Sequence, residues 1–232
     1  NRIKIIINRA DIILNLKTIW QEKREYSYEK NILNFNKELV NLIKKTDKNK
    51  EFIFFSGLGV SEESHSKRIK YISKTEQYIL NNLRGVSIIR PSIVIGRGDK
   101  FLSRILPIIK LSYFVPLFGA GNAKLQPVFV DDVAIAIELI LLKKNDNNSI
   151  YELVGPEIFT YKSLYKLIVE CLGLKRKFVP IPFVLAKVGV SIIEKTPINL
   201  ITKDQLLLFK ENNIFSYKYK GFENIGFKPR DL

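Results

Sequence analysis

Residue types that carry common kinds of chemistry are scarce in this chain of 232 residues. It has one cysteine, Cys171, and one histidine, His65, so an internal disulfide is excluded and a zinc site built on these residue types is disfavoured. Cys171 shares a helical face with leucine and isoleucine residues, and we expect its thiol to be buried. A chain with so few thiols fits a reducing compartment.

Methionine is absent, and so is any apolar run of the ~20 residues that a membrane-spanning helix needs. Residues 178–193 come closest, but Pro180, Pro182 and Lys187 interrupt them, which leaves a core helix or a helix lying on a surface. The chain also lacks a phosphate-binding glycine fingerprint, because no strand leads into residues 119–121 and no helix starts there. The missing methionine indicates a processed chain or a fragment.

Basic residues are in large excess, because 38 lysines and arginines against 23 aspartates and glutamates give a net charge of +15. Such a charge attracts anions, which include nucleic acid, acidic lipid headgroups, acidic protein surfaces and phosphorylated cofactors. AT-rich coding would produce the same abundance of lysine, isoleucine and asparagine without any selection for binding. The lysines are scattered over many predicted helices and form no stacking motif with aromatic residues, which disfavours a nucleic-acid site.

The first half of the chain alternates strands and helices. Residues 52–55 and 86–89 are short apolar runs typical of buried strands, and residues 67–83 between them have apolar side chains at helical spacing. A further buried strand at 11–16 and a helix at 27–45 precede them. Three strands joined by helices predict an open parallel sheet, in which ligands bind at the carboxyl ends of the strands.

After Pro91 the alternation becomes irregular, and residues 116–124 are interpreted as a turn. We therefore expect two parts, a core made of residues 1–96 and a smaller lobe made of residues 97–232. One strand–helix unit of the second part, residues 126–143, is predicted to return to the core. The two adjacent aspartates in that unit are expected to cap its helix, with a catalytic carboxylate pair as the alternative.

Sequence motifs in a fixed order then identify a resemblance. They lie at residues 54–59 (FFSGLG), 90–96 (RPSIVIG), 99–102 (DKFL), 126–134 (QPVFVDDVA), 151–157 and 202–205. Together they resemble the atypical short-chain dehydrogenase/reductase proteins, and among these the NAD(P)-binding, dehydrogenase-like accessory subunit of respiratory complex I and its bacterial relatives. The motif at 90–96 is shared across the superfamily, whereas the whole series, over roughly residues 8–228, is more specific.

This resemblance implies a fold and a cofactor. The fold is an α/β, Rossmann-like, doubly wound parallel sheet with a small C-terminal α/β lobe. The sheet would be incomplete at its N-terminus, because the family's first strand, glycine-rich turn and helix, which hold the cofactor pyrophosphate, are missing from this sequence. The implied cofactor is NAD or NADP, with NADPH favoured, and no metal is implied. The residues that match its binding positions are Asn15, Leu16, Ser56, Lys74, Pro91, Ser92 and Val94.

The resemblance also bears on catalysis. Active members place a tyrosine four residues before a lysine on one helix, so that the lysine lowers the pKa of the tyrosine. Lys74 matches the lysine, but Lys70 occupies the position four residues earlier, and Tyr71 lies three residues earlier. Ser56, Tyr71 and Lys74 are therefore the candidate catalytic residues, in an arrangement that departs from the active pattern.

Three functions remain open. The first is an NAD(P)-binding, non-catalytic subunit of complex I or a protein associated with it, with acidic membrane lipids as a further candidate partner. It implies the matrix face of the mitochondrial inner membrane or, in bacteria, the cytoplasm or the cytoplasmic face of the inner membrane. The second is an active NAD(P)-dependent reductase or epimerase acting on a small carbonyl or nucleotide-sugar substrate. The third, which the scattered lysines disfavour, is a nucleic-acid-binding protein on the same fold.

Overall fold

The computed structural model describes residues 2–46, 50–143, 147–193 and 201–232, which fold into two compact units. Unit 1 consists of Asn1–Pro91, Val133–Leu153 and Ser216–Lys228, and unit 2 consists of Ser92–Asp132, Val154–Phe215 and Pro229–Leu232. The division expected at residue 96 therefore falls at Pro91. The returning part also differs from the expected strand–helix unit, since unit 1 takes up a helix, a further strand and a C-terminal segment, while the strand at 128–129 stays in unit 2.

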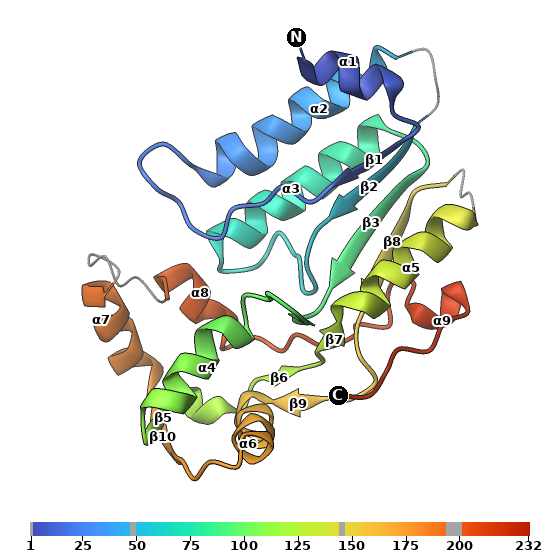
Figure 1. Cartoon of the computed structure of the whole chain (residues 1–232). Helices are drawn as coiled ribbons and strands as arrows, with labels where there is room; N and C mark the ends of the chain where they lie inside the picture. The colour runs from blue at the N-terminus through green and yellow to red at the C-terminus, as the bar shows by residue number, and fades with distance from the viewer. Residues whose placement is uncertain (1, 47–49, 144–146, 194–200) are drawn as a thin grey trace. The chain divides into compact units, whose positions relative to one another are not determined.

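A four-stranded sheet forms the centre of unit 1 (Figure 1). Its strands, in spatial order, are β1 (Ile12–Asn15), β2 (Glu51–Phe55), β3 (Val86–Pro91) and β8 (Ser149–Leu153), and all neighbours are parallel. The three strands predicted from the alternation thus lie side by side, which confirms the parallel sheet. Because all strands run the same way, their carboxyl ends share one edge.

Helices cover both faces of this sheet (Figure 1). A π-helical turn, η1 (Glu29–Asn34), continues into α2 (Phe35–Lys44), which lies with α3 (Lys67–Asn82) on one face, and α5 (Val130–Leu142) lies on the other. The hydroxyl of Ser66 caps α3 by accepting a hydrogen bond from a backbone N–H of its first turn at 3.3 Å. Two short helices, α1 (Arg2–Arg9) and α9 (Phe222–Ile225), also belong to unit 1.

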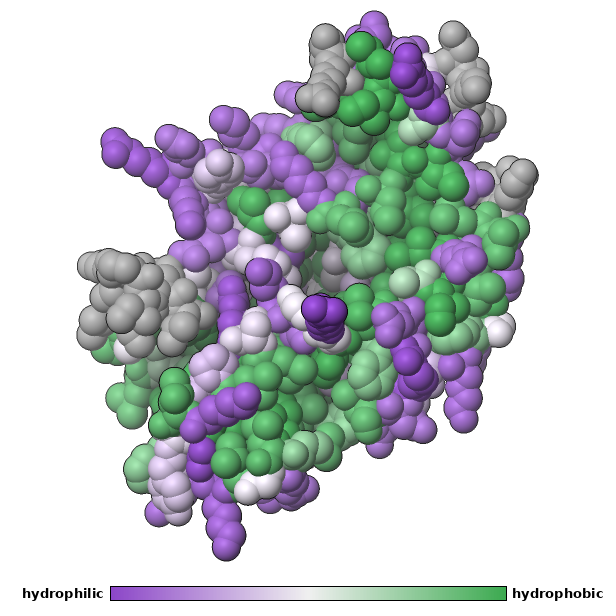
Figure 2. All heavy atoms as spheres, viewed as in Figure 1, coloured by the Kyte–Doolittle hydropathy of each residue, from purple (hydrophilic) through white to green (hydrophobic). Residues whose placement is uncertain are grey.

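The middle of the sheet is buried, and its β1 edge is not. Phe52, Phe54 and Ile88 in β2 and β3 are almost completely buried. Ile12 and Leu14 of β1 are 47% and 44% exposed, because among the described residues β1 has a neighbouring strand on one side only. The expectation of a buried first strand was therefore wrong. Figure 2 shows apolar residues gathered over α1, β1 and α5.

The described residues of unit 2 form short paired strands and four helices. β5 (Phe114–Phe118) pairs in parallel with β10 (Lys177–Ile181), β4 (Val94–Ile95) in parallel with β7 (Val128–Phe129), and β6 (Lys124–Leu125) in antiparallel with β9 (Phe159–Thr160). The helices are α4 (Leu102–Leu111), α6 (Tyr161–Cys171), α7 (Phe183–Ile193) and α8 (Lys203–Leu208), and a 3₁₀ turn, η2 (Gly119–Gly121), follows β5. α4, β5 and α6 share one apolar core that includes Ile109, Val115 and Leu164.

Two segments of unit 2 differ from the structure expected of them. Residues 116–124, interpreted as a turn, contain most of β5 before η2 begins. Residues 178–193 are a strand followed by a helix, since β10 ends at Ile181 and α7 begins at Phe183. A proline disfavours helical backbone in the residue before it, so Pro180 and Pro182 keep this stretch extended.

Two side chains of unit 2 also differ from expectation. Cys171 is exposed, because it lies about 200° round α6 from Val169, which belongs to the buried side of that helix. Asp132 lies inside the first turn of α5 and does not cap it, since the helix already begins at Val130. Its carboxylate is buried and accepts hydrogen bonds from Nε and the backbone N–H of Arg230 at 2.8 and 2.9 Å.

Candidate functional site

The carboxyl edge of the unit 1 sheet is where a ligand is expected, since all four strands end there. This edge carries Asn15 of β1, Ser56 after β2, Arg90 of β3 and Glu152 of β8. The turn after β2 is fixed to β3, because the Ser56 N–H donates to the Ile89 carbonyl at 2.8 Å. The partners of these polar side chains decide what chemistry the edge can support.

A chain of buried polar groups runs along this edge. The Ser56 hydroxyl donates to the Glu76 carboxylate of α3, and the Arg90 guanidinium donates to both oxygens of that carboxylate, at 3.0 Å from Nε and 2.5 Å from Nη2. On its other side, Nη1 of Arg90 lies 3.9 Å from Oε1 of Glu152. The second oxygen of Glu152 accepts the Ser216 N–H at 2.8 Å. We call Glu76, Arg90 and Glu152 the buried triad.

The triad is almost completely withdrawn from water. Glu76, Arg90 and Glu152 are 3%, 7% and 2% exposed, and the ring of Tyr219 lies over the guanidinium, with its centroid 4.7 Å away. Burial alone lowers the pKa of Arg90, but the hydrogen bonds and the charge of Glu76 outweigh it and raise that pKa above its ordinary value. The guanidinium is therefore permanently charged and ties α3, β8 and the C-terminal segment to the strand ends.

Glu76 also fixes which side of α3 faces Ser56. Residues four and eight positions earlier in a helix lie on that same side, and these are Ile72 and Arg68. Lys74 lies two positions from Glu76, about 200° round the helix, and its side chain is exposed. We call the side of α3 that carries Arg68, Ile72 and Glu76 its inner side, and the side that carries Lys74 its outer side.

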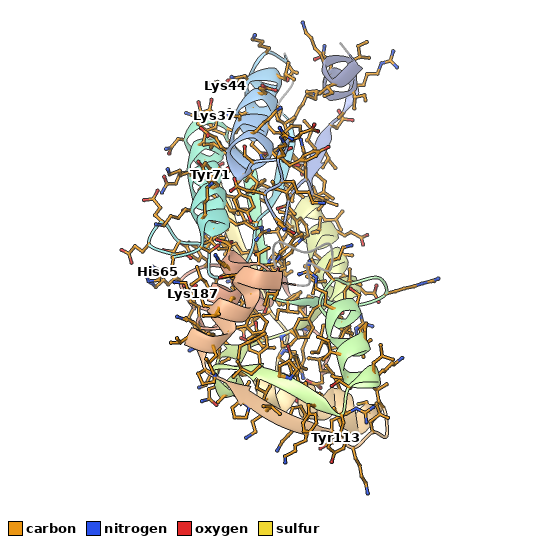
Figure 3. All side chains as sticks on the ribbon, turned by 90° about the vertical axis from the view of Figure 1, so that its left-hand side faces the viewer. Lys37, Lys44, His65, Tyr71, Tyr113 and Lys187 are labelled. Atoms are coloured by element: carbon orange, nitrogen blue, oxygen red, sulfur yellow. The ribbon has the colours of Figure 1, made fainter. Side chains whose placement is uncertain are left out.

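The candidate pair Tyr71 and Lys74 lies on the outer side. The Lys74 ammonium is 5.7 Å from the centroid of the Tyr71 ring, and Figure 3 shows Tyr71 on the part of α3 that is turned away from the sheet. The structure thus brings these two residues together on the outer side of α3. Ser56 is engaged by Glu76 instead.

The inner side of α3 is filled by other side chains. The Arg68 guanidinium donates to the Ile19 carbonyl at 3.0 Å and to the Thr18 hydroxyl at 3.1 Å, and it stacks 4.2 Å from the centroid of the Trp20 ring. These contacts hold the segment after β1 against the helix. Ile72, one turn further on, is 3% exposed. Within the described ranges, this inner side carries no tyrosine–lysine pair.

The end of β1 supplies one buried and one accessible residue. Both polar atoms of the Asn15 amide have partners, since Nδ2 donates to Oδ1 of Asn36 at 2.6 Å and Oδ1 accepts the Lys17 N–H at 3.0 Å. Leu16 is 58% exposed. Asn15 therefore shapes the strand end, whereas Leu16 is open to a ligand.

The motif around Pro91 divides between the two units. In unit 1, Pro91 ends β3 and its carbonyl accepts the Leu58 N–H at 3.0 Å. In unit 2, the hydroxyl of buried Ser92 donates to Oδ1 of Asn213 at 2.8 Å, and Val94 begins β4. The role of Pro91, Ser92 and Val94 in cofactor binding stays a prediction.

Sequence reasoning missed four charged residues that shape this edge, namely Arg68, Glu76, Arg90 and Glu152. A signal existed for two of them. Glu152 stands inside an apolar strand, where a charge is costly unless a partner neutralises it. Glu76 is the single acidic residue in the sequence of α3, a helix that otherwise carries only basic charges. Both observations call for a buried arginine or lysine partner.

The described residues also bear on metal binding and on membrane spanning. Across the four described ranges, no group of three or more histidine, cysteine, aspartate or glutamate residues is arranged to hold a metal ion. None of the described helices combines the length and the apolar character required to cross a bilayer.

Solved structures share this fold. A nucleoside-diphosphate-sugar epimerase from Staphylococcus aureus aligns over 98% of this chain and 76% of that one, with a TM-score of 0.73 and 14% identity. A dTDP-glucose 4,6-dehydratase from Bacillus anthracis, solved in complex with NAD, aligns over 100% and 72%, with a TM-score of 0.69 and 16% identity. The chain therefore has the Rossmann-like α/β fold of the short-chain dehydrogenase/reductase proteins, as the resemblance implied.

Sequence comparison shows which proteins of this class the chain is similar to. Subunit 9 of the mitochondrial NADH dehydrogenase [ubiquinone] 1 alpha subcomplex from Arabidopsis thaliana is 30% identical over 95% of this chain, and its counterpart from Mus musculus is 25% identical over 99%. The chain spans 60% and 61% of the length of these two relatives. No model of a protein family matches the chain. The resemblance to this complex I subunit is thereby confirmed.

Proposed function

We propose that this chain is part of an NAD(P)-binding, non-catalytic accessory subunit of respiratory complex I. Similarity to subunit 9 from a plant and an animal, over 95% and 99% of the chain, supports the assembly. The residues on the inner side of α3 support the proposal that the subunit is non-catalytic. Arg68 and Ile72 fill the positions that face the strand ends, and Glu76 engages the Ser56 hydroxyl. A proton-transfer pair would have to displace these buried side chains.

The proposal implies a location and partners. Both relatives are mitochondrial proteins, which supports a mitochondrial location for this one. The finer expectation is the matrix face of the inner membrane, in contact with other complex I subunits. In a bacterium, the corresponding place would be the cytoplasm or the cytoplasmic face of the inner membrane.

The described residues fit one end of a dinucleotide. The turn after β2 is open at Gly57, because a Cβ added there would meet no atom within 4 Å. Ser56 and Pro91 at the strand ends would border the nicotinamide of bound NAD or NADP, which supplies hydride chemistry in enzymes of this fold. The pyrophosphate end is different, since within the described ranges no glycine-rich turn joins a strand to a helix as a phosphate cradle.

Native electrophoresis tests the assembly. Membranes that contain the full-length protein are extracted with a mild detergent and separated without denaturation. The protein should migrate with complex I subunits. Migration as a free monomer under conditions that keep complex I intact would refute the assembly.

Nucleotide titration tests the cofactor and the lack of catalysis. Binding of NADH and NADPH to the purified full-length protein is followed by nicotinamide fluorescence, and we expect tighter binding of NADPH. Addition of small carbonyl compounds or nucleotide sugars should leave the nucleotide unoxidised. Turnover that Tyr71→Phe or Lys74→Ala abolishes would support the active reductase or epimerase instead.

A further inference from the structure

The turn between α4 and β5 in unit 2 exposes three large apolar side chains within four residues. Leu111, Tyr113 and Phe114 are 88%, 59% and 55% exposed. Figure 3 shows Tyr113 at one end of the β5–β10 pair. Single exposed apolar residues are ordinary, but a contiguous group marks a surface that contacts something. We call this surface, together with the neighbouring Lys110, Lys175, Arg176 and Lys177, the basic tip.

The fold holds these side chains outward. Phe114 lies opposite Lys177 in the parallel β5–β10 pair, and the Lys177 N–H donates to the Tyr113 carbonyl at 2.9 Å. The hydroxyl of Ser112 accepts the Phe114 N–H at 3.1 Å, which closes the turn. The rings of Tyr113 and Phe114 pack edge to face, with centroids 5.3 Å apart. These contacts therefore hold the apolar side chains in a fixed, outward position.

A guanidinium fixes the base of the tip. Arg176 donates from Nη2 to the Lys110 carbonyl at 3.0 Å and from Nε to the Ile109 carbonyl, and these carbonyls belong to the open C-terminal end of α4. A positive charge at this end of a helix is stabilised by the helix dipole. The same contacts bring the 175–177 segment beside the end of α4, where Lys177 lies opposite Phe114.

All charges of the tip have the same sign. Lys110, Lys175, Arg176 and Lys177 are positive, and residues 102–118 and 172–183 contain no aspartate or glutamate. Lysines spread around protruding aromatic and aliphatic side chains suit a bilayer surface, where rings enter the headgroup region while ammonium groups meet phosphates. A protein partner would instead need a matched acidic pocket for three separate apolar side chains.

We propose that the basic tip docks on the surface of a membrane that contains anionic phospholipids. Tyr113 and Phe114 enter the headgroup layer, Leu111 reaches the top of the acyl chains, and the lysines contact lipid phosphates. Neither an apolar anchor nor a basic patch binds a bilayer firmly alone, and the tip combines the two. This inference goes beyond the proposed function, because the contact requires neither complex I nor a cofactor.

Sedimentation with lipid vesicles tests the docking. The full-length protein should bind vesicles of phosphatidylcholine mixed with cardiolipin, bind pure phosphatidylcholine vesicles much more weakly, and lose affinity as salt is added. The double variant Lys175→Gln, Lys177→Gln should bind about 25-fold more weakly, since each lysine near an anionic surface contributes about a factor of five. Lys124→Gln, Lys162→Gln is the matched control, with the same change of charge on exposed residues elsewhere in unit 2.

The apolar residues are tested separately. Tyr113→Ser, Phe114→Ser keeps every charge and should also weaken binding to the mixed vesicles by about tenfold or more. Phe114→Trp should give a blue-shifted emission when the vesicles are added. Equal losses in the tip and control variants, or binding that ignores cardiolipin, would overturn the proposal. It is also overturned if the protein ignores vesicles while the serine variant fails to assemble with complex I, since the occupant would then be a protein.

Discussion

Replacing Glu76 by glutamine tests whether the buried triad holds unit 1 together. The change keeps the size of the side chain and removes its charge. In the native protein both carboxylate oxygens accept hydrogen bonds from Arg90, and one also accepts from the Ser56 hydroxyl. A glutamine keeps one of these acceptors and presents an amide N–H to a guanidinium N–H, so that one donor faces another.

The expected cost is large because the guanidinium that remains is buried. Arg90 is 7% exposed, and its second carboxylate partner, Glu152, lies 3.9 Å away. Removing one member of a buried ion pair costs about 3–5 kcal/mol. In a chain of this size each kcal/mol lowers Tm by about 2–4 °C, so Glu76→Gln should lower the Tm of unit 1 by about 6–20 °C.

Thermal unfolding followed by circular dichroism, checked by urea unfolding, measures this loss. Glu62→Gln is the control, because it removes the same charge from an exposed side chain in the loop before α3 and should change the free energy of unfolding by less than about 0.5 kcal/mol. If the two variants are equally stable, the triad contributes nothing to unit 1 and the reasoning fails.

Two further predictions concern unit 2. A Cβ at Gly155 would lie 1.9 Å from the Pro127 carbonyl oxygen, so Gly155→Ala should lower the free energy of unfolding in urea by about 1–3 kcal/mol, whereas Gly189→Ala, with open space around it, should not lower it. Burial raises the pKa of Tyr161 to about 12, so the stability that its neutral phenol contributes is complete below pH ~10 and is lost as the pH rises towards 12, by up to about 1.4 kcal/mol per pH unit. Tyr161→Phe should reduce the slope of that part of the stability profile in urea unfolding at several pH values, while the neighbouring buried Tyr165, whose pKa burial also raises, keeps the rest of the slope. Tyr113→Phe, at an exposed position, is the matched control.

The central sheet could be predicted because its middle strands have few alternatives. The runs at 52–55 and 86–89 are apolar except for Ser87, as is typical of strands that helices cover on both sides. β8 could not be assigned to this sheet from the sequence, since the first segment of unit 2, Ser92–Asp132, and helix α5 separate it from β3 along the chain. Only the finished register, with Tyr151 opposite Ile89, places it there. The exposure of β1 could not be predicted either, because it depends on which strands lie beside β1 in the folded sheet.

The position of the candidate site was predictable, but its chemistry was not. Strand ends are visible as breaks in apolar runs, which is why Ser56 and Pro91 could be located beforehand. Which side of α3 faces them depends on the contact of Glu76 with Arg90, a pairing between residues that are 14 positions apart. Spacing along one helix fixes the angle between its side chains and leaves open which of them points inward. The candidate pair was chosen by its spacing from Lys74, and it therefore lies on the outer side of α3.

The importance of the helix side can be tested by restoring the four-residue tyrosine–lysine spacing on the outer side of α3. Lys70→Tyr places a phenol four residues before Lys74, which is the arrangement of active members, yet both positions are exposed on α3. We expect this variant to gain no nicotinamide-dependent turnover in the nucleotide assay and to keep its Tm within about 2 °C, because exposed helix positions tolerate such changes. Turnover gained by Lys70→Tyr and lost again on adding Lys74→Ala would show that the outer side faces the cofactor. In the present structure Arg68 and Ile72 hold the side that reaches the strand ends, and a tyrosine–lysine spacing has chemical meaning only on that side.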